Sequence, residues 1–269
     1  QPSVSNALRR LEDRIGQRLV ERDATHFELT EVGKLLYEQS IEVFGAISQL
    51  PQLVRGVGDD VTGHVTISVA SHIVSPIFDR ALALFHEQHP RATLTINVSA
   101  STEVARLVRE KRASFGLGLV SNRDPALDYT MVYREFFGFF CGPRHRMFGQ
   151  SGLTLADLKG EPSVSFQTDH IADALRPVAL LRSEARLSPD VVGTSSSLEE
   201  VRRMIITGLG IGPLPLHVAR REIDDGLLWR LPPYDNPPAI DVFLIHNPEA
   251  NLNKAEKAML AGLKELIVS

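Results

Sequence analysis

Residues 1–16 read Gln1-Pro-Ser-Val-Ser-Asn-Ala-Leu-Arg-Arg-Leu-Glu-Asp-Arg-Ile-Gly16 and have the pattern of an amphipathic helix. The apolar side chains recur at helical spacing and form one stripe, predicted to be buried, at Val4, Leu8, Leu11 and Ile15. At about 100° per residue, the opposite side carries Pro2, Ser3, Asn6, Arg9, Arg10 and Asp13. Hydroxyl, amide and guanidinium groups of this kind hydrogen-bond base edges and phosphates in a DNA major groove. The alternative for this segment taken alone is an ordinary helix with a solvated face.

Two short alternating runs follow the helix. Leu19–Arg22 and Phe27–Leu29 flank Asp23-Ala24-Thr25-His26 and predict a small hairpin, or wing. Thr30 is the expected N-cap of a long second helix. Helix, wing and long helix in this order are typical of a winged helix-turn-helix.

These residues resemble the second half of the DNA-binding domain of LysR-type transcriptional regulators. The likeness is carried by Gln1-Pro-Ser-Val-Ser, Leu8-Arg-Arg-Leu-Glu, Gly16, Leu19, Glu21-Arg22 and Leu29-Thr-Glu-Val-Gly33. It implies that the chain begins inside the motif, without the first helix and the start of the turn. We expect the DNA contacts at Gln1, Pro2, Ser3, Asn6, Arg9 and Arg10.

The composition bounds the class of protein. A length of 269 residues predicts about two domains, and 43% hydrophobic residues are enough for real cores. No apolar run reaches 18 residues, so no membrane span is expected. A single cysteine, Cys141, excludes an internal disulfide within this sequence and fits a reducing cytoplasm. The net charge is −4, and residues 1–34 carry six basic and six acidic side chains. DNA binding would therefore depend on where the arginines lie rather than on net charge.

From Thr30 to about Val54 the apolar positions approach a heptad seam, with Gln39 as its polar exception: Val32, Leu36, Val43, Ala46, Leu50 and Leu53. Such a helix needs a partner, and a second copy of the chain is the simplest one. The alternative is a helix packed on its own domain. Pro51 should bend or end the helix, and residues 56–63 form a polar joint. The resemblance implies a dimerising linker helix.

After the joint, strands and helices alternate, which is typical of a parallel sheet with helices on both faces. We expect strands at 64–70, 93–98 and 116–120 and helices at 76–87 and 102–112. Further strands are expected at 129–133, 136–141, 163–166, 191–193, 211–214 and 239–246. Further helices are expected at 155–158, from about 169 to 182, at 198–207 and at 252–268.

This order predicts two α/β lobes, with the chain crossing between them near residues 136–141 and 240–246. The predicted domains are a partial winged helix-turn-helix (1–29), a linker helix (30–57), lobe I (58–138 with 243–269) and lobe II (139–242). The second half resembles the LysR family's effector domain, a periplasmic-binding-protein-like fold, most clearly at Leu153–Gly160 and Gly208–Pro215. Ala100, Lys111 and Ser114 stand where that family usually has Gly, Gly and Asp.

Four strand-to-helix turns carry hydroxyl, amide or imidazole groups: 71–72, 99–102, 167–168 and 194–197. Free N–H groups at helix starts bind carboxylates and other anions, and ligands of open α/β sheets lie at strand ends. The predicted effector-binding residues are Ser71, His72, Ser101, Thr102, Gln167, Thr168 and Ser196. His72 is the expected charge partner of the ligand. The alternative for each hydroxyl is a simple helix cap.

For the other motifs, structural roles are expected rather than functional ones. Gly208-Leu-Gly-Ile-Gly212 follows a helix, so a helix end with close packing is expected rather than a dinucleotide site. His86-Glu-Gln-His89 has the wrong spacing for a metalloprotease. Cys141 is expected to be a buried structural thiol. No metal site, cofactor or catalytic set is expected.

The sequence thus favours a cytoplasmic transcriptional regulator that binds promoter DNA as a homodimer or homotetramer. A small polar or anionic effector between the lobes would alter DNA binding. One alternative is a solute-binding protein of the same two-lobed fold. The other is a small-molecule enzyme with its site in the cleft.

Overall fold

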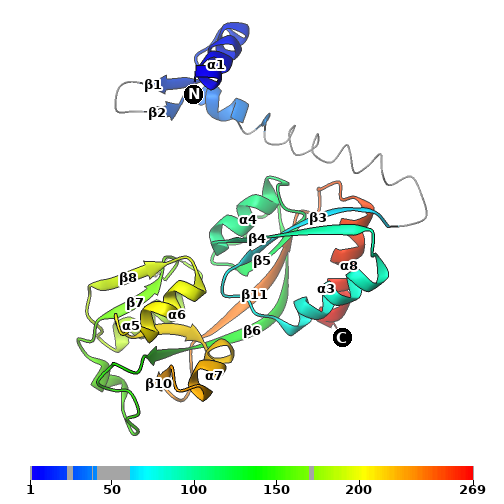
Figure 1. Cartoon of the computed structure of the whole chain (residues 1–269). Coiled ribbons are helices and arrows are strands. Elements are labelled where there is room, and N and C mark those ends of the chain that lie inside the picture. The colour runs from blue at the N-terminus through cyan, green and yellow to red at the C-terminus, as the bar shows by residue number, and fades with distance from the viewer. Residues whose placement is uncertain (1, 23–26, 38, 41–60, 170–172, 269) are drawn as a thin grey trace. The chain divides into compact units, whose positions relative to one another are not determined.

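The computed structural model describes residues 2–22, 27–37, 39–40, 61–169 and 173–268 (Figure 1). The chain divides into two compact units, residues 1–54 and 55–269, which are described separately.

The first unit begins with helix α1, Pro2–Ile15, followed by the antiparallel strands β1, Val20–Arg22, and β2, Phe27–Leu29. The helix ends because Gly16 adopts a φ of +72°, a left-handed conformation that glycine takes without strain. Its amide donates to the carbonyl of Glu12 at 2.8 Å. The predicted helix and the two paired strands of the wing are therefore confirmed, whereas the turn at residues 23–26 lies outside the described residues.

A second helix starts directly after the wing, and residues 31–37 and 39–40 are helical. The hydroxyl of Thr30 accepts a hydrogen bond from the Gly33 amide at 3.0 Å, which confirms the predicted N-cap. The same hydroxyl donates to the carbonyl of Arg18 at 2.7 Å. A Cβ at Gly33 would lie 2.0 Å from the carbonyl oxygen of Leu19, so only glycine fits where helix and wing meet. Most of the predicted seam (Val43, Ala46, Leu50 and Leu53), Pro51 and residues 56–60 lie outside the described residues.

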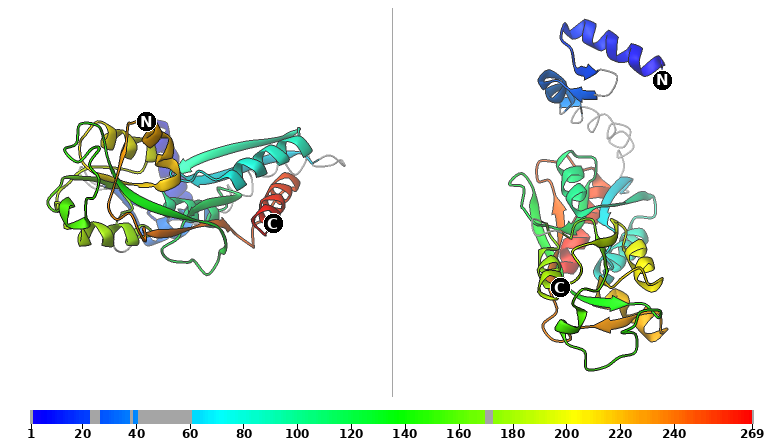
Figure 2. Two further views of the ribbon diagram at one scale, coloured as in Figure 1. Left: turned by 90° about the horizontal axis from the view of Figure 1, so that it is seen from below. Right: turned by 90° about the vertical axis from the view of Figure 1, so that its left-hand side faces the viewer.

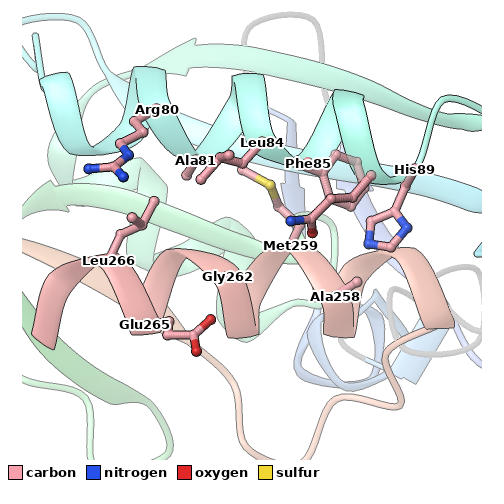
Figure 3. A pocket seen from close by; sticks show the side chains of 11 residues that line it. Arg80, Ala81, Leu84, Phe85, His89, Ala258, Met259, Gly262, Glu265 and Leu266 are labelled. Carbon is pink, nitrogen blue, oxygen red and sulfur yellow. The ribbon is translucent and has the colours of Figure 1, made fainter. Parts of the chain in front are cut away.

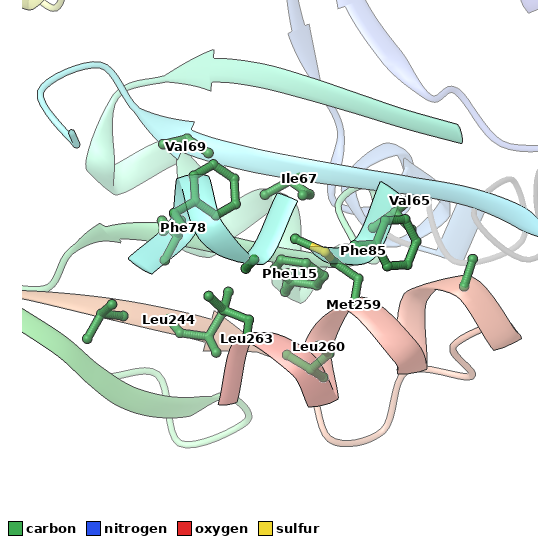
Figure 4. Packing of buried hydrophobic residues seen from close by; sticks show 14 of the residues in the cluster. Val65, Ile67, Val69, Phe78, Phe85, Phe115, Leu244, Met259, Leu260 and Leu263 are labelled. Atoms are coloured by element: carbon green, nitrogen blue, oxygen red, sulfur yellow. The ribbon is translucent and has the colours of Figure 1, made fainter. Parts of the chain in front are cut away.

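In the second unit, lobe I contains three parallel strands in the order β4, β3, β5. They are β3, Gly63–Ala70; β4, Ala92–Ser99; and β5, Phe115–Leu119. Helices α3, Pro76–Gln88, and α8, Lys254–Val268, lie side by side on one face (Figures 1 and 2). Helix α4, Ser101–Arg109, packs on the other face through Val104 and Val108. The main core lies under α3 and α8, where Ile67, Phe115 and Met259 are fully covered (Figure 4).

A polar cluster secures the start of α8 to this sheet. Asn253 and Glu256 form a reciprocal cap, in which each backbone amide donates to the other's side chain at 2.7 and 3.0 Å. The second oxygen of the Glu256 carboxylate accepts from the hydroxyl of Ser114 at 2.6 Å. Ser114 in turn accepts from the Thr66 amide at 3.1 Å. These bonds satisfy polar groups that are almost fully buried.

Two long antiparallel strands join the lobes: β6, Asp128–Cys141, and β11, Ala239–His246. The prediction of two separate strands at 129–133 and 136–141 was wrong, because β6 is continuous. The charged residue Arg134 does not interrupt it, because Asp241 lies directly opposite on β11. The guanidinium donates to both carboxylate oxygens, at 2.6 and 3.1 Å.

Lobe II is built on the far end of β6, which pairs with β9, Gly212–Pro215, and with β10, Trp229–Leu231. Strands β7, Ser163–Phe166, and β8, Val191–Ser195, run parallel to each other. The helices are η1, Leu155–Leu158; α5, Arg176–Glu184; α6, Leu198–Ile206; and α7, Leu216–Asp224.

Two helix predictions need correction, and one helix was not predicted. Helix α5 begins at Arg176 rather than near Asp169, with a proline in its first turn, where a missing N–H costs nothing. Helix α7 and the short strand β10 were not predicted from the sequence. Helix α4 ends at Arg109 rather than Arg112 because Lys111 adopts a φ of +56°. The Lys111 amide donates to Val108 and the Arg112 amide to Leu107, the bonding of a left-handed helix end.

We expect Lys111→Gly to stabilise the chain. A side chain at a left-handed position costs about 1 kcal/mol, and the greater freedom of unfolded glycine offsets part of the gain. The expected rise in the free energy of unfolding is about 0.5 kcal/mol, measured by urea denaturation. Lys111→Ala is the control, because alanine keeps the Cβ. Equal stabilities of the two variants would contradict the strain at this position.

Candidate functional site

Helix α1 presents the predicted DNA-binding face. Asn6, Arg9 and Arg10 are all exposed on it, together with Asp13. Glu12 faces the wing instead, because its carboxylate accepts from the Leu19 amide at 2.8 Å. Gln1 lies outside the described residues, and for Pro2 and Ser3 only the helical backbone is described.

The apolar stripe of α1 is partly exposed among the described residues. Leu8 is half-buried, but Leu11 and Ile15 are 42% and 38% exposed. The described residues of this unit therefore do not cover the stripe. An amphipathic helix gains most of its stability by burying such a face, so α1 has unused apolar surface.

Two of the predicted turns meet between the lobes. Ser71, at the end of β3, donates its hydroxyl proton to the carbonyl of Ser196 at 2.6 Å. Its oxygen accepts from the Leu198 amide, the first residue of α6, at 3.2 Å. Ser197, the N-cap residue of α6, makes no side-chain cap of its own. Ser71 therefore caps a helix of the other lobe, and this interlobe cap joins lobe I to lobe II.

The other predicted residues do not all join this contact. Ser101 is buried, and its hydroxyl accepts from the Leu119 amide at 3.3 Å within lobe I. Thr102 and Gln167 are exposed, and Thr168 is half-buried. The Gln167 amide donates to the carbonyl of Ser195 at 3.1 Å, so its backbone tethers β7 to β8.

His72 contacts a residue that the sequence analysis missed. Its Nε2 lies 3.7 Å from Oε1 of Glu135 on β6, and its ring meets the edge of Phe166 from lobe II. Burial lowers the pKa of His72 to about 4, with the nearby His217 acting in the same direction. Burial raises the pKa of the Glu135 carboxyl to about 8. Both groups are therefore largely uncharged at neutral pH, which is at odds with His72 as a charge partner for an anion.

A cavity of about 490 Å³ lies beside this pair. Its walls come from the start of α3, from β6 and from the start of α7, and they include Ile77, Tyr133, Glu135, Phe136, Leu216 and His217. Burial, and then the nearby Glu135, raise the pKa of the Tyr133 hydroxyl, and burial lowers the pKa of His217. Polar groups from both lobes thus meet around a largely apolar space.

One feature of the sequence could have indicated that Glu135 belongs to the site. Glu135 sits two residues from Tyr133 and two from Phe137, so alternation along a strand places it on an inward face between aromatic residues. A carboxyl at such a position is costly to bury and often functional. The residue was missed because Arg134-Glu135 was taken as a break between two strands.

A second hollow, of about 270 Å³, lies between α3 and α8 (Figure 3). Phe85 and Met259 point into it, and its charged side chains Arg80 and Glu265 are exposed. Its lining contains none of the seven predicted effector-binding residues.

The remaining motifs have the structural roles expected. Gly208 has a φ of +84° just after α6, and a Cβ at Gly210 would lie 2.7 Å from the carbonyl oxygen of Pro162. This confirms a helix end with close backbone packing. Cys141 is buried and free, and burial raises its pKa to about 12. Within the described part of the chain, no three His, Cys, Asp or Glu side chains form a group that could hold a metal. No helix described there is long and apolar enough to cross a membrane.

Ser71→Ala should loosen the start of α6. Loss of the interlobe cap leaves the Leu198 amide without its acceptor, at a cost of about 1.4 kcal/mol. We expect amide hydrogen exchange at Leu198 to accelerate by roughly tenfold. Ser71→Thr keeps a hydroxyl and should exchange like the wild type. Unchanged exchange in the alanine variant would show that this bond does not hold the lobes together.

The stability of the chain should fall as pH rises from 6.5 to 8. In this window the native chain keeps the Glu135 proton that the unfolded chain has already released, so deprotonation favours unfolding. Below pH 6.5 the lowered pKa of His72 acts in the opposite direction. We expect Glu135→Gln to remove a decline of about 1 kcal/mol per pH unit, measured by urea denaturation. Glu249→Gln, at an exposed position, is the control and should keep it. Identical slopes in wild type and Glu135→Gln would contradict the buried acid.

Comparison with known proteins agrees with this architecture. Residues 58–267 match the LysR substrate binding domain, and residues 1–34 match the bacterial regulatory helix-turn-helix protein, lysR family. The hydrogen peroxide-inducible genes activator of Dickeya chrysanthemi is 24% identical, over 98% of this chain and 86% of that protein.

Solved structures share the fold. The structure of Vibrio fischeri DarR in complex with DNA has a TM-score of 0.62 to this chain at 20% sequence identity. The match covers 99% of this chain and 89% of the DarR chain. A hydrogen peroxide-bound cysteine-to-serine mutant of Corynebacterium glutamicum OxyR has a TM-score of 0.59 at 19% identity, with coverages of 99% and 82%. With a helix-turn-helix segment at its start and a two-lobed substrate-binding domain after it, the chain belongs to the LysR family of transcriptional regulators.

Proposed function

We propose that this chain is a cytoplasmic regulator that binds double-stranded promoter DNA as a homo-oligomer and responds to a small molecule held between its lobes. The parts would be a DNA-binding segment (1–29), a linker helix (30–57), lobe I (58–138 with 243–269) and lobe II (139–242). Its role would be regulation rather than catalysis. The observation that carries the proposal is the exposed face of α1, which presents an amide and two guanidinium groups.

The exposed amide and guanidinium groups of α1 support its assignment to DNA. Within a segment of balanced charge, the Glu12 carboxylate accepts from the Leu19 and Val20 amides of the wing, and Arg9 and Arg10 are exposed. Arginine forms paired hydrogen bonds with guanine and strong bonds with phosphate, and asparagine pairs with adenine. Gln1, Pro2 and Ser3 precede these residues at the start of the helix. The structure of Vibrio fischeri DarR with DNA gives a precedent among proteins of this fold.

Exposed apolar side chains support association between copies. On the helix after the wing, Val32, Leu35 and Tyr37 are 37%, 61% and 51% exposed. On the edge strand β4, Ile96 and Val98 are exposed as well. Association of identical chains would cover such surfaces and place two α1 helices on one duplex, as a palindromic site requires.

The interlobe cap supports a ligand-responsive cleft. The hydroxyl of Ser71 is bonded to Ser196 and Leu198, so a ligand that takes over these bonds changes how the lobes meet. Thr102, Gln167 and Thr168 would add polar contacts from neighbouring turns, with Ser101 behind them. By linkage, such a ligand and DNA must alter each other's affinity by the same factor.

The chemistry of Cys141 bears on the kind of signal. Two of the proteins compared are named for hydrogen peroxide. The thiolate is the reactive form of cysteine, and a pKa raised to about 12 keeps the buried Cys141 protonated at neutral pH. The effector proposed for this chain is therefore a non-covalent ligand rather than an oxidant of this thiol.

Arg9→Ala and Arg10→Ala should each weaken binding of the full-length protein to its operator by about 1–3 kcal/mol if the arginine reads a base. The operator would first be found by sequencing the genomic fragments that the protein retains. Fluorescence anisotropy at fixed salt then gives the affinities, with Arg203→Ala, an exposed arginine of α6, as the control. Wild-type affinity in both α1 variants would refute this helix as the DNA-reading element.

A further inference from the structure

One side chain of α1 is bonded to the start of the wing. The Oε1 atom of Glu12 accepts hydrogen bonds from the backbone amides of Leu19, at 2.8 Å, and Val20, at 3.3 Å. Both of these residues are buried, with 3% and 7% of their surface exposed. A buried amide needs an acceptor, and here a side chain of α1 supplies one acceptor for two amides.

The helix after the wing is bonded to the same short segment. The amide of Thr30 donates to the carbonyl of Leu19 at 3.0 Å, and the hydroxyl of Thr30 donates to the carbonyl of Arg18 at 2.7 Å. Gly33 lies so close that a Cβ there would be 2.0 Å from the Leu19 carbonyl oxygen. Residues 18–20 are thus held by both helices. We call this segment, together with Glu12 and Thr30, the junction.

The junction restrains α1 where other contacts are few. The helix ends at the left-handed Gly16, and Leu11 and Ile15 are 42% and 38% exposed, so apolar packing within the described residues holds this end only in part. The Glu12 bonds fix the helix one turn before Gly16. Because Arg9 lies one turn before Glu12 on the same helix, the place of its guanidinium depends on how Glu12 is held.

We propose that Glu12 is a positioning residue for operator recognition, which holds α1 at the angle from which Arg9 and Arg10 reach the bases. Paired hydrogen bonds from a guanidinium to a guanine require alignment within a fraction of an ångström. Attraction to phosphates depends mainly on charge and tolerates a displaced helix. Glu12 thus contributes to specificity more than to general attraction for DNA. The inference rests on the proposed function, because it requires that α1 reads DNA.

The bonds of Thr30 extend this restraint to the second helix. Glu12 and Thr30 hold adjacent residues of one segment, so a change in the direction of the second helix carries α1 with it. Their contributions to operator binding should therefore be coupled. We expect Glu12→Ala with Thr30→Val to weaken operator binding by less than the product of the two single effects. Effects that simply multiply would overturn the junction as one unit.

The main test compares an operator duplex with a scrambled duplex of the same length, by fluorescence anisotropy with the full chain at several salt concentrations. Glu12→Ala should lower the operator affinity roughly tenfold. Its affinity for the scrambled duplex and the salt dependence of that affinity should match the wild type. Glu12→Gln keeps an acceptor oxygen and should restore operator binding. Glu31→Ala, which removes an exposed acid from the next helix, is the control for charge and should bind like the wild type.

Hydrogen exchange separates a displaced helix from an unfolded one. In Glu12→Ala we expect faster exchange at the Leu19 and Val20 amides, which lose their acceptor. The amide of Gly16 should exchange as in the wild type, because it donates to the backbone carbonyl of Glu12. If the alanine variant does not fold, Glu12→Asp keeps the charge and withdraws the acceptor by one methylene group. It should also lose operator affinity while keeping its affinity for the scrambled duplex.

Wild-type operator affinity in Glu12→Ala and Glu12→Asp, or equal losses for both duplexes, would overturn the positioning role. Arg9→Ala and Arg10→Ala, measured on the same duplexes, distinguish this failure from that of the proposed function. If the arginine variants bind the operator weakly and the Glu12 variants bind it normally, only the positioning role is refuted. If the arginine variants bind normally as well, α1 is not the DNA-reading element.

Discussion

The pairing of β6 with β11 is the constraint on which the second unit depends. The two strands run antiparallel from Asp128 to Phe136 and from Ala239 to His246, and the chain crosses between the lobes through both. Backbone hydrogen bonds fix their register, and the ion pair of Arg134 with Asp241 lies within it. The lobes can therefore bend relative to each other, but a shift of one residue would turn every inward side chain outward. Hinge bending is the motion that this connection permits.

Contacts outside these strands set how the lobes meet. The interlobe cap puts a serine of lobe I at the start of a helix in lobe II, and His72 of lobe I meets Phe166 of lobe II nearby. A few bonds of this kind, each contributing about 1 kcal/mol, hold one arrangement without locking it. Ligands that form or replace them can shift the balance, because populations respond to differences of that size.

Much of the fold could be predicted from the sequence. Alternation and turn residues placed β7 and β11 at their observed bounds, and the N-cap at Thr30 was found from its hydroxyl. Helix α7 was not found because it follows β9 directly, with Pro215 in place of a capping side chain. The break assigned at Arg134-Glu135 failed for a different reason. A charged residue fits a strand when its partner stands across the sheet, and that partner is more than one hundred positions away in the chain.

Partners that are distant in the sequence also limited the prediction of the site. Ser71 and Ser196 were predicted because they carry hydroxyls at strand ends. The sequence around Ser71 did not indicate that this residue would cap α6, which follows Ser196. Nor did the sequence around Ser101 indicate that its hydroxyl would bond within lobe I. Glu135 was not predicted as a site residue, because the residues around it come from three separate segments of the chain. Long-range neighbours decide such roles.

The hydroxyl of Ser114 has a consequence for substitutions at the start of the last helix. It donates to the buried Glu256, so an aspartate at position 114 would set two acidic groups face to face in a buried place, and one of them would have to stay protonated. The side chains at positions 114 and 256 are thus coupled, although they lie far apart in the chain.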